Sequence, residues 1–135
     1  ESNDATLASV PQSLPALLHA HKLQKKAARV GFDWPSVEGS LEKLHEECHE
    51  LEQAVTSGSN TDIEEELGDI LFTITNIIRK KELNAESILQ DANKKFRRRF
   101  TAMESIATSH QKDLQDCTLE ELEAFWQQAK LCQQP

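Results

Sequence analysis

The chain has 135 residues, a length that suits one domain with its own hydrophobic core and is too short for two. Lysine and arginine total 15 against 23 aspartate and glutamate residues, and the formal net charge of -8 disfavours broad binding to nucleic-acid phosphates. Four glycines, four prolines, no tyrosine and 5% aromatic residues exclude most β-sandwiches and barrels and favour helices.

The cysteines and the apolar runs indicate the compartment. Cys48, Cys117 and Cys132 are odd in number and form no CxxC pair, which is typical of a reduced, cytosolic protein. No apolar run approaches the ~20 residues of a membrane span, and the first residues lack the apolar core of a signal peptide. We therefore expect a soluble, cytoplasmic protein with no membrane or nucleic-acid partner. Because the only methionine is Met103, we also expect the chain to be part of a longer protein.

The N-terminal half is predicted to contain three helices. Residues 1–12 lack periodicity and are interpreted as a tail or linker, followed by one domain at 13–135. Ser13 is the expected cap of a first helix that ends near Arg29, and Ser36 that of a second helix that ends near Thr56. Apolar residues of the second helix are spaced as in a helix-packing seam, at Val37, Leu41, Leu44, Cys48, Leu51 and Val55.

The third helix is expected to be the centre of the core. A capping box of Thr61 and Glu64 predicts its start, and Lys80 and Lys81 suit its end. Its apolar face is wide and comprises Ile63, Leu67, Ile70, Leu71, Ile74, Ile77 and Ile78.

Two further helices are predicted after this one. Asn84 is the expected cap of a fourth, highly charged helix, and Thr118 with Glu121 forms a capping box for a short last helix after a loop at 110–117. The apolar positions of the fourth helix are Ile88, Leu89, Ala92, Phe96, Phe100 and Met103. No segment alternates with the period of a strand, so the fold class is all-α, an antiparallel helical bundle whose wide apolar faces indicate oligomerisation.

Two pairs of carboxylates form the candidate metal site. Glu47 and Glu50 lie on one face of the second helix, and Glu66 and Asp69 on one face of the third. At roughly 100° per residue, each pair falls to the same side of its helix's apolar stripe. If the two helices pack antiparallel through those stripes, the four carboxylates converge on one side of the seam.

Such a cluster favours a divalent cation, because like charges repel and raise carboxylate pKa values when no cation is bound. Oxygen ligands without a paired histidine or cysteine select Mg²⁺, with Mn²⁺ as a substitute. The alternative is that these acidic residues belong to solvated helix surfaces, the common situation for a charged helix.

Candidate substrate-binding residues lie on the last two predicted helices. Lys95 and Arg99 are one turn apart and could contact phosphates, although a solvated cationic face or a nucleic-acid patch are alternatives. Trp126 and Lys130 are also one turn apart and could stack on a base and touch a phosphate, although a tryptophan at such a position more often belongs to the core.

The sequence suggests three other interpretations. His45 to His49 matches the HExxH pattern of zinc metalloproteases, with Glu46 as the base, but no third ligand is apparent and both histidines point away from the acidic pairs. Glu46 and His49 also match the ExxH of di-iron bundles, which need a second copy that is absent from this sequence. The non-enzymatic alternative is a helical dimerisation or interaction module, for which the apolar stripes would be the interface.

Several segments together resemble the MazG family of nucleoside triphosphate pyrophosphohydrolases over about residues 13–130. They are the segment from Ala20 to Trp34 with its GFDW turn, EExxE at Glu46 to Glu50, ExxD at Glu66 to Asp69, and the strip at residues 93–100. MazG proteins carry two tandem copies of this domain, and the chain resembles the second copy, so the resemblance implies a missing N-terminal MazG domain.

The resemblance implies an all-α fold that forms a homodimer, with each active site in a four-helix bundle. It also implies hydrolysis of (deoxy)nucleoside triphosphates at the α phosphorus to a monophosphate and pyrophosphate. The implied ligands of Mg²⁺ are Glu47, Glu50, Glu66 and Asp69. The implied substrate contacts are Lys95 and Arg99 at the phosphates and Trp126 and Lys130 over the nucleotide.

The general base, the substrate preference and the biological role are less defined. Glu46, Glu47 and Glu50 are all candidates for the base, and the sequence does not rank them. Few aromatic residues and no distinctive polar pocket predict tolerance of several bases. Housecleaning of damaged nucleotides and control of a normal or alarmone pool both remain open as roles.

Overall fold

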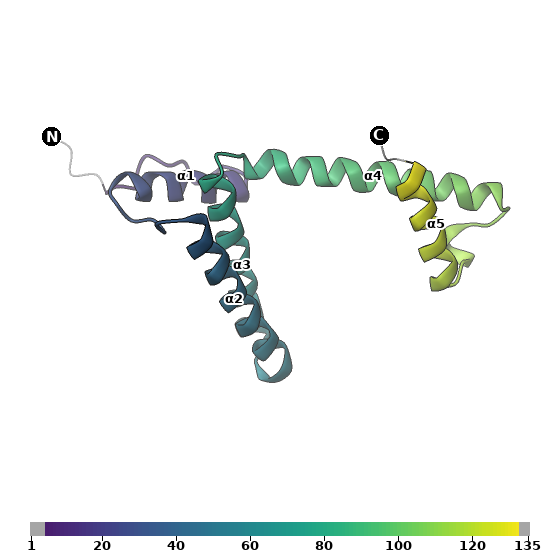
Figure 1. Cartoon of the computed structure of the whole chain (residues 1–135), viewed down its shortest axis with the longest axis horizontal. Helices are drawn as coiled ribbons and strands as arrows, with labels where there is room; N and C mark the ends of the chain where they lie inside the picture. Colours follow the sequence, from purple (N-terminus) through teal and green to yellow (C-terminus); the bar gives the residue numbers. More distant parts are fainter. Residues whose placement is uncertain (1–4, 133–135) are drawn as a thin grey trace. The chain divides into compact units, whose positions relative to one another are not determined.

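The computed structural model describes residues 5–132, which contain helices and no strand, and it confirms the predicted all-α class. Contacts between residues divide the chain into a first unit that extends to Ile88 and a second that begins at Leu89, and each is described by itself. None of the described helices is long and apolar enough to cross a membrane. The helices are α1 (Ala16–Arg29), α2 (Val37–Ser57), α3 (Asn60–Lys80), α4 (Ala85–Ser109), the 3₁₀ helix η1 (Leu114–Asp116) and α5 (Leu119–Cys132) (Figure 1).

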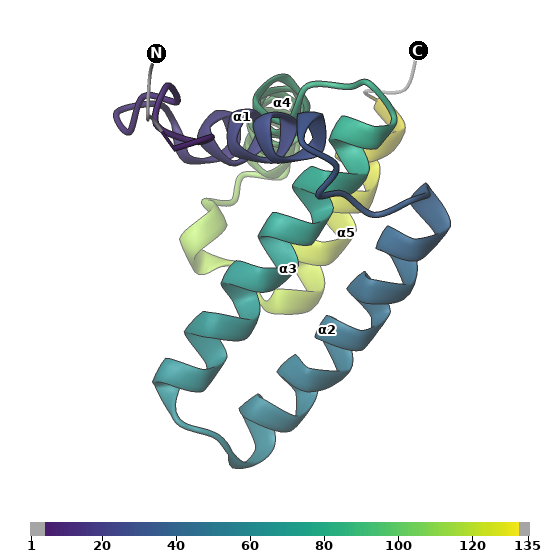
Figure 2. The same ribbon diagram turned by 90° about the vertical axis from the view of Figure 1, so that its left-hand side faces the viewer.

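The first unit is built on an antiparallel hairpin of α2 and α3, with α1 packed against α3 (Figure 2). The turn between α2 and α3 requires a glycine, because a Cβ on Gly58 would lie 2.8 Å from the backbone oxygen of Ala54. This tight turn holds the two long helices side by side, as the short connection predicted.

The predicted start of α2 is confirmed, and the predicted start of α1 is not. Ser36 caps α2 as predicted, since its hydroxyl accepts a hydrogen bond from the Gly39 N–H at 3.1 Å. The predicted cap at Ser13 is wrong: α1 begins at Ala16, and the extended backbone of Pro15 (ψ 144°) keeps the preceding residues out of the helix. The predicted tail also contains the buried Val10, which its lack of periodicity gave no reason to expect.

The start of α3 is a second correction. The capping box is formed by Ser59 and Asp62 and not by Thr61 and Glu64, so the helix begins earlier, at Asn60. Both pairs fit the sequence pattern of a capping box, and the earlier pair is used because only Gly58 and Ser59 lie between the last residue of α2 and the first residue of α3.

The starts of α4 and α5 are confirmed. Asn84 accepts a hydrogen bond from the Ser87 N–H at 2.8 Å. Thr118 and Glu121 form the predicted reciprocal box, with contacts of 2.9 and 3.1 Å. The predicted loop at 110–117 also contains η1.

The predicted apolar faces of α2 and α3 are confirmed only in part within this chain. The half-buried members are Val37, Leu44 and Leu51 on α2 and Ile63, Ile70, Ile77 and Ile78 on α3, and no residue of either stripe is fully buried. Residues of both predicted stripes are exposed, at Leu41 (41%), Val55 (63%), Leu67 (44%), Leu71 (57%) and Ile74 (38%). The residues that are buried on these helices are instead Ser40, Glu47 and Ala54 on α2 and Thr73, Thr75 and Asn76 on α3. The wide apolar face of α3 is therefore not the centre of the core of this single chain.

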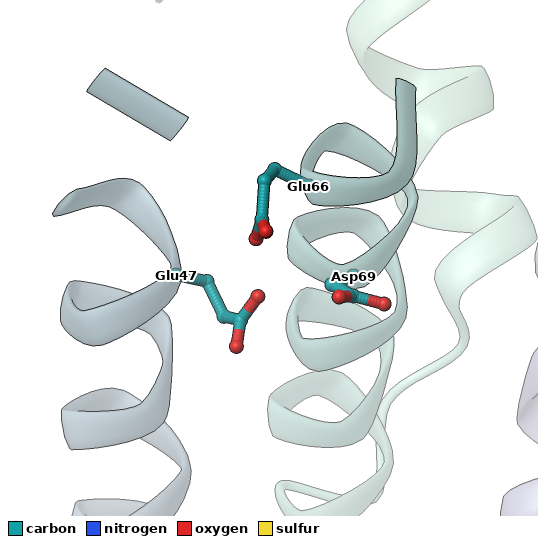
Figure 3. A group of neighbouring side chains, drawn as sticks. All are labelled: Glu47, Glu66 and Asp69. Carbon is teal, nitrogen blue, oxygen red and sulfur yellow. The ribbon is translucent and has the colours of Figure 1, made fainter. Parts of the chain in front are cut away.

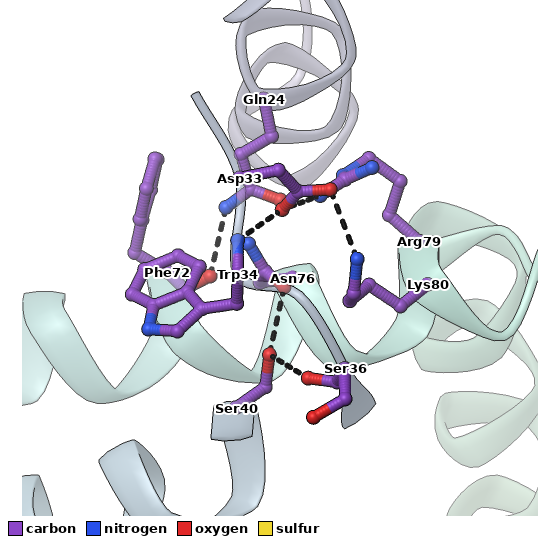
Figure 4. A network of polar contacts seen from close by, with 9 residues as sticks. All are labelled: Gln24, Asp33, Trp34, Ser36, Ser40, Phe72, Asn76, Arg79 and Lys80. Atoms are coloured by element: carbon purple, nitrogen blue, oxygen red, sulfur yellow. Dashed lines mark hydrogen bonds and ion pairs between the residues drawn. The ribbon is translucent and has the colours of Figure 1, made fainter. Parts of the chain in front are cut away.

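Polar contacts explain why the buried faces are shifted. The Ser40 hydroxyl donates to Asn76 Oδ1 at 3.0 Å between α2 and α3, and Gln24 Nε2 of α1 donates to the Phe72 carbonyl at 2.9 Å (Figure 4). Hydrogen bonds offset the cost of burying polar groups, so such residues can occupy a seam that periodicity assigns to leucine and isoleucine.

The second unit consists mainly of α4 and α5. Its core comprises Met103, Ala107, Phe125 and Ala129. Of the predicted apolar positions of α4, Met103 is buried, whereas Phe96 (58%) and Phe100 (36%) are exposed.

Candidate metal centre

Three of the four predicted metal ligands lie together between α2 and α3. Glu47 of α2 and Glu66 and Asp69 of α3 each offer a carboxylate oxygen, and these oxygens all lie within 4.8 Å of one another (Figure 3). Glu47 is buried, Glu66 is half-buried and Asp69 is exposed. The cluster thus extends from the seam of the hairpin to the surface.

Helix geometry explains this convergence. Glu47 is about two turns from Ser40 and from Ala54, both of which are also buried. Glu47 therefore lies in the seam between α2 and α3, whereas the sequence predicted a position to one side of the seam. Glu66 and Asp69 are separated by three residues and share a face of α3. The antiparallel hairpin then brings the two faces together.

The electrostatics of the cluster are those of crowded, partly desolvated carboxylates. Burial raises the pKa of Glu66, and the neighbouring Glu47, Glu50 and Asp69 raise it further, to about 7. Glu47 Oε2 and Glu66 Oε1 are buried without a hydrogen-bond partner among the residues that the structure describes. An unpartnered buried carboxylate oxygen is costly, so the arrangement favours a bound cation.

The donor set fits a hard divalent cation. All three groups supply oxygen, which Mg²⁺ and Mn²⁺ prefer, and no histidine or cysteine belongs to the cluster. The two unpartnered oxygens come from different helices, so one ion could satisfy both.

Glu50 and Glu46 lie outside the three-residue cluster. Glu50 is exposed on α2, close enough for its charge to affect the pKa of Glu66. The Glu46 side chain is 61% exposed and pairs with Lys43. Both remain candidates for the roles predicted from the sequence.

The HExxH histidines lie away from the acidic cluster. His45 and His49 are exposed on α2, and His49 contacts Glu52 and Gln53 of its own helix. Each is two residues from the buried Glu47, about 200° around the helix, and so lies on the opposite face.

The four predicted substrate-binding residues are all in the second unit. Lys95 is exposed and Arg99 is half-buried on α4, with the Arg99 Nε buried and unpartnered among the described atoms. Trp126 and Lys130 are half-buried on α5, and the Trp126 ring centroid lies 5.6 Å from that of Phe96. Trp126 therefore packs against an aromatic residue of the second unit, as the core alternative predicted. Part of its side chain stays accessible to solvent.

Sequence reasoning missed Lys43, the partner of the buried Glu47. Lys43 Nζ lies 3.0 Å from Glu47 Oε1 and 3.1 Å from Glu46 Oε1. These contacts raise the pKa of Lys43. Its position one turn before Glu47 is a signal that the sequence contains, since residues four apart on a helix are neighbours.

The sequence also gave no indication of a cavity in the first unit. It has a volume of about 570 Å³ and lies between α1, α3 and the segment from Phe32 to Pro35. The lining is mostly apolar and aromatic, with Gln24, Asp33, Asn76 and Arg79 as polar members. Along α3, Asn76 is about two turns beyond Asp69, so the cavity is next to the acidic cluster on the same helix.

A largely buried ion-pair network fixes the segment that lines this cavity (Figure 4). Asp33 Oδ1 lies 2.6 Å from Arg79 Nη2 and accepts the Trp34 N–H at 2.8 Å. Asp33 Oδ2 lies 3.0 Å from Lys80 Nζ. Although burial opposes it, hydrogen bonds from Lys80 and Arg79 lower the pKa of Asp33.

Together, the helical hairpin and its oxygen-only cluster define an all-α domain with a candidate divalent-metal centre between two antiparallel helices. The family model described as the MazG nucleotide pyrophosphohydrolase domain matches residues 36–103, a range that includes α2, α3 and most of α4. The chain belongs to this family.

Curated relatives extend the similarity to nearly the whole chain. The nucleoside triphosphate pyrophosphohydrolase of Escherichia coli (strain K12) is 40% identical over 134 residues, 96% of this chain and 50% of the relative. The nucleoside triphosphate pyrophosphohydrolase/pyrophosphatase MazG of Thermotoga maritima is 39% identical over 117 residues, 87% of this chain and 45% of the relative. Protein YabN of Bacillus subtilis (strain 168) is 42% identical over 130 residues, 96% of this chain and 27% of the relative. The chain thus spans about half the length of the first two.

Proposed function

We propose that this chain hydrolyses (deoxy)nucleoside triphosphates at the α phosphorus, giving a nucleoside monophosphate and pyrophosphate, with Mg²⁺ as cofactor. The observation that carries the proposal is the oxygen-only cluster of Glu47, Glu66 and Asp69, in which two buried carboxylate oxygens lack a partner. Family membership and the names of the Escherichia coli and Thermotoga maritima relatives support the same reaction.

Glu47, Glu66 and Asp69 would hold the ion, and Glu50 would complete the set from the exposed side of α2. When bound, Mg²⁺ supplies a water nucleophile of lowered pKa and neutralises charge that develops on the α-phosphate. Glu46, Glu47 and Glu50 remain the candidates to accept the proton of the water. Lys95 and Arg99 would stabilise the negative charge of the leaving pyrophosphate, and Trp126 with Lys130 would close over the nucleotide.

The apolar cavity is a suitable place for the nucleoside. Its aromatic and apolar lining would shield a planar base from water. Gln24 Nε2 donates to the Phe72 carbonyl and Asn76 Oδ1 accepts from Ser40, whereas Gln24 Oε1 is buried without a partner among the described residues. Because most of the lining is apolar, the cavity would select by shape more than by base-edge hydrogen bonds, and this supports broad base tolerance.

A second copy of the chain would cover the apolar residues that α2 and α3 leave exposed. Leu41 and Val55 follow the buried Ser40 and Ala54 by one residue, and Ile74 follows Thr73 in the same way. One residue is a rotation of about 100° from the buried seam. In two antiparallel helices that face each other, this rotation leads to the same side of the hairpin, so Leu41, Val55 and Ile74 form one apolar face. Two hairpins that pack through this face would give the four-helix bundle of a homodimer.

The position of the chain within a longer protein is a separate proposal. Its relatives from Escherichia coli and Thermotoga maritima are about twice as long as the matched region, which supports a second MazG domain N-terminal to this one. A cytoplasmic role in nucleotide housecleaning would suit such an enzyme, and the alternative is control of a normal or alarmone pool.

Product analysis tests the activity. The chain is incubated with mixed NTPs and dNTPs in Mg²⁺ or in EDTA, and products are resolved by ion-exchange chromatography. Monophosphate and pyrophosphate that disappear in EDTA are the expected result. Intact triphosphates would contradict the proposal, and an absence of any Mg²⁺-dependent rise in melting temperature would then favour the non-catalytic helical interaction module.

A further inference from the structure

Lys43 of α2 lies between two carboxylates of its own helix, the buried Glu47 and the exposed Glu46. Its Nζ is 3.0 Å from Glu47 Oε1 and 3.1 Å from Glu46 Oε1. The Lys43 side chain is 39% exposed, the Glu46 side chain 61% and the Glu47 side chain 4%. Lys43 therefore reaches from the surface of the helix to a carboxylate that water barely contacts.

This contact makes the two oxygens of Glu47 unequal. Within residues 5–132, Lys43 is the one cation at ion-pair distance from Glu47, and it holds Oε1. Oε2 is buried and has no partner among the described residues. Glu66 and Asp69 contribute the other oxygens of the cluster from α3.

A buried carboxylate without a fixed partner would be free to change rotamer and to turn either oxygen, or neither, towards the cluster. Loss of an ion-pair partner from a buried charge is also costly, so the side chain would move towards solvent if it could. An ion pair at one oxygen prevents both motions. Groups that hold a metal-ligating carboxylate in this way commonly contribute ten- to a hundredfold to metal affinity.

We propose that Lys43 is a positioning residue for the metal centre: by holding Glu47 Oε1 it presents Oε2 to a divalent cation shared with Glu66 and Asp69. Glu46 supports this role from the solvent side, because its carboxylate binds the same ammonium group and limits the rotamers of the lysine. The inference rests on the proposed function, since it requires that the cluster binds a divalent cation.

The alternative role of Lys43 is simple charge compensation, and it predicts the opposite sign. A lysine that only neutralises the cluster competes with the cation, so its removal would leave a more negative site and tighter metal binding. A lysine that positions Glu47 makes binding weaker when it is removed. The direction of the change in affinity thus separates the two roles without any measurement of turnover.

The experiment measures Mn²⁺ binding to the nucleotide-free chain by electron paramagnetic resonance of the free ion. Lys43→Met should raise the dissociation constant about tenfold or more, and Lys43→Arg, which keeps charge and donors, should restore it to within about threefold of the wild-type value. Lys25→Met removes the same charge from an exposed position on α1 and should leave the constant within about twofold. Thermal unfolding checks that each variant folds, and Lys43→Gln, with a shorter neutral donor, replaces Lys43→Met if that variant does not.

Each result has a distinct meaning. Unchanged or tighter Mn²⁺ binding in Lys43→Met would overturn the positioning role and leave the metal centre intact. A wild-type chain that binds no Mn²⁺ would overturn the metal centre, and the positioning role with it.

Discussion

Arg79 at the end of α3 lies 2.6 Å from Asp33 in the segment that joins α1 to α2, and both side chains are largely buried. Lys80 binds the other oxygen of Asp33 at 3.0 Å. One carboxylate therefore joins the end of one helix to the connection between two others, next to the apolar cavity.

Replacement of Asp33 by asparagine should destabilise the fold by about 2 kcal/mol at pH 7, because two largely buried cations lose their charged partner. Hydrogen bonds from Lys80 and Arg79 lower the pKa of Asp33 in the folded chain. The stabilisation that Asp33 gives to the fold is therefore present above its pKa in the unfolded chain and is lost as the pH falls through its lower pKa in the folded chain. Urea unfolding at a series of pH values should show the wild type and Asp33→Asn converging below about pH 4.

Asp91→Asn is the matched control, since Asp91 is exposed on α4 and makes no ion pair within the described part of the chain. It should unfold like the wild type at every pH. An Asp33→Asn variant as stable as Asp91→Asn at pH 7 would show that the ion pairs contribute nothing measurable.

Glu66 makes the metal-free chain sensitive to pH in the opposite direction. Burial and the neighbouring carboxylates raise its pKa from the usual 4.5 to about 7. A group whose pKa is higher in the folded state favours folding below its unfolded pKa, and this contribution is lost as the pH rises through the folded pKa. The melting temperature in EDTA should therefore fall between pH 5 and pH 8, and Mg²⁺, which binds the ionised form, should oppose the fall.

The Glu66→Gln variant tests the assignment of this titration. It lacks the ionisable group, so its melting temperature in EDTA should change less between pH 5 and pH 8 than that of the wild type. An identical slope in the two proteins would place the pH dependence elsewhere.

The predicted ligands should be needed for turnover and not for folding. Asp69→Asn and Glu50→Gln each remove a charge from an exposed side chain, so circular dichroism should show an unchanged helical content. Loss of a ligand should lower kcat for NTP hydrolysis at least about a hundredfold. Glu65→Gln, an exposed neighbour outside the cluster, should retain wild-type kcat. Near-normal turnover in both ligand variants would refute the site.

The apolar face of the hairpin should be an interface between two copies of the chain. Leu71 is 57% exposed on α3 and, three residues before Ile74, lies on the same side of the helix, so Leu71→Glu would place a charge in that interface. Size-exclusion chromatography with light scattering should show a dimer for the wild type and a monomer for Leu71→Glu. Leu119→Glu, at an 80% exposed position on α5, should stay dimeric. A Leu71→Glu variant that elutes as the wild type does would exclude this face as the interface.

The positions of the helices could largely be predicted from local sequence, because caps such as Ser36 and Asn84 act on the residues directly beside them. The exceptions are informative. At the start of α3, the sequence offers two capping boxes, and the close approach of Gly58 to Ala54 decides between them. A close backbone contact of this kind is not visible in residue spacing.

The buried face of the hairpin could not be predicted from apolar periodicity. Ser40 and Asn76 are buried because they bind each other, and Glu47 because Lys43 binds it. The spacing of apolar residues predicts which hydrocarbon side chains leave water, and it carries no information about polar residues that are buried as bonded pairs. The acidic site was nevertheless predicted for three of its residues, since an antiparallel hairpin brings Glu47 close to Glu66 and Asp69.

Hydrolysis at the α phosphorus places the oxygen of the attacking water in the nucleoside monophosphate, so the fate of solvent oxygen distinguishes this reaction from attack at the β or γ phosphorus. ATP is incubated with the wild-type chain and Mg²⁺ in ¹⁸O-labelled water, and the masses of both products are measured by mass spectrometry. Attack at the α phosphorus should leave one ¹⁸O atom in the phosphate of AMP and none in pyrophosphate. Label in pyrophosphate, or release of orthophosphate in place of pyrophosphate, would contradict it.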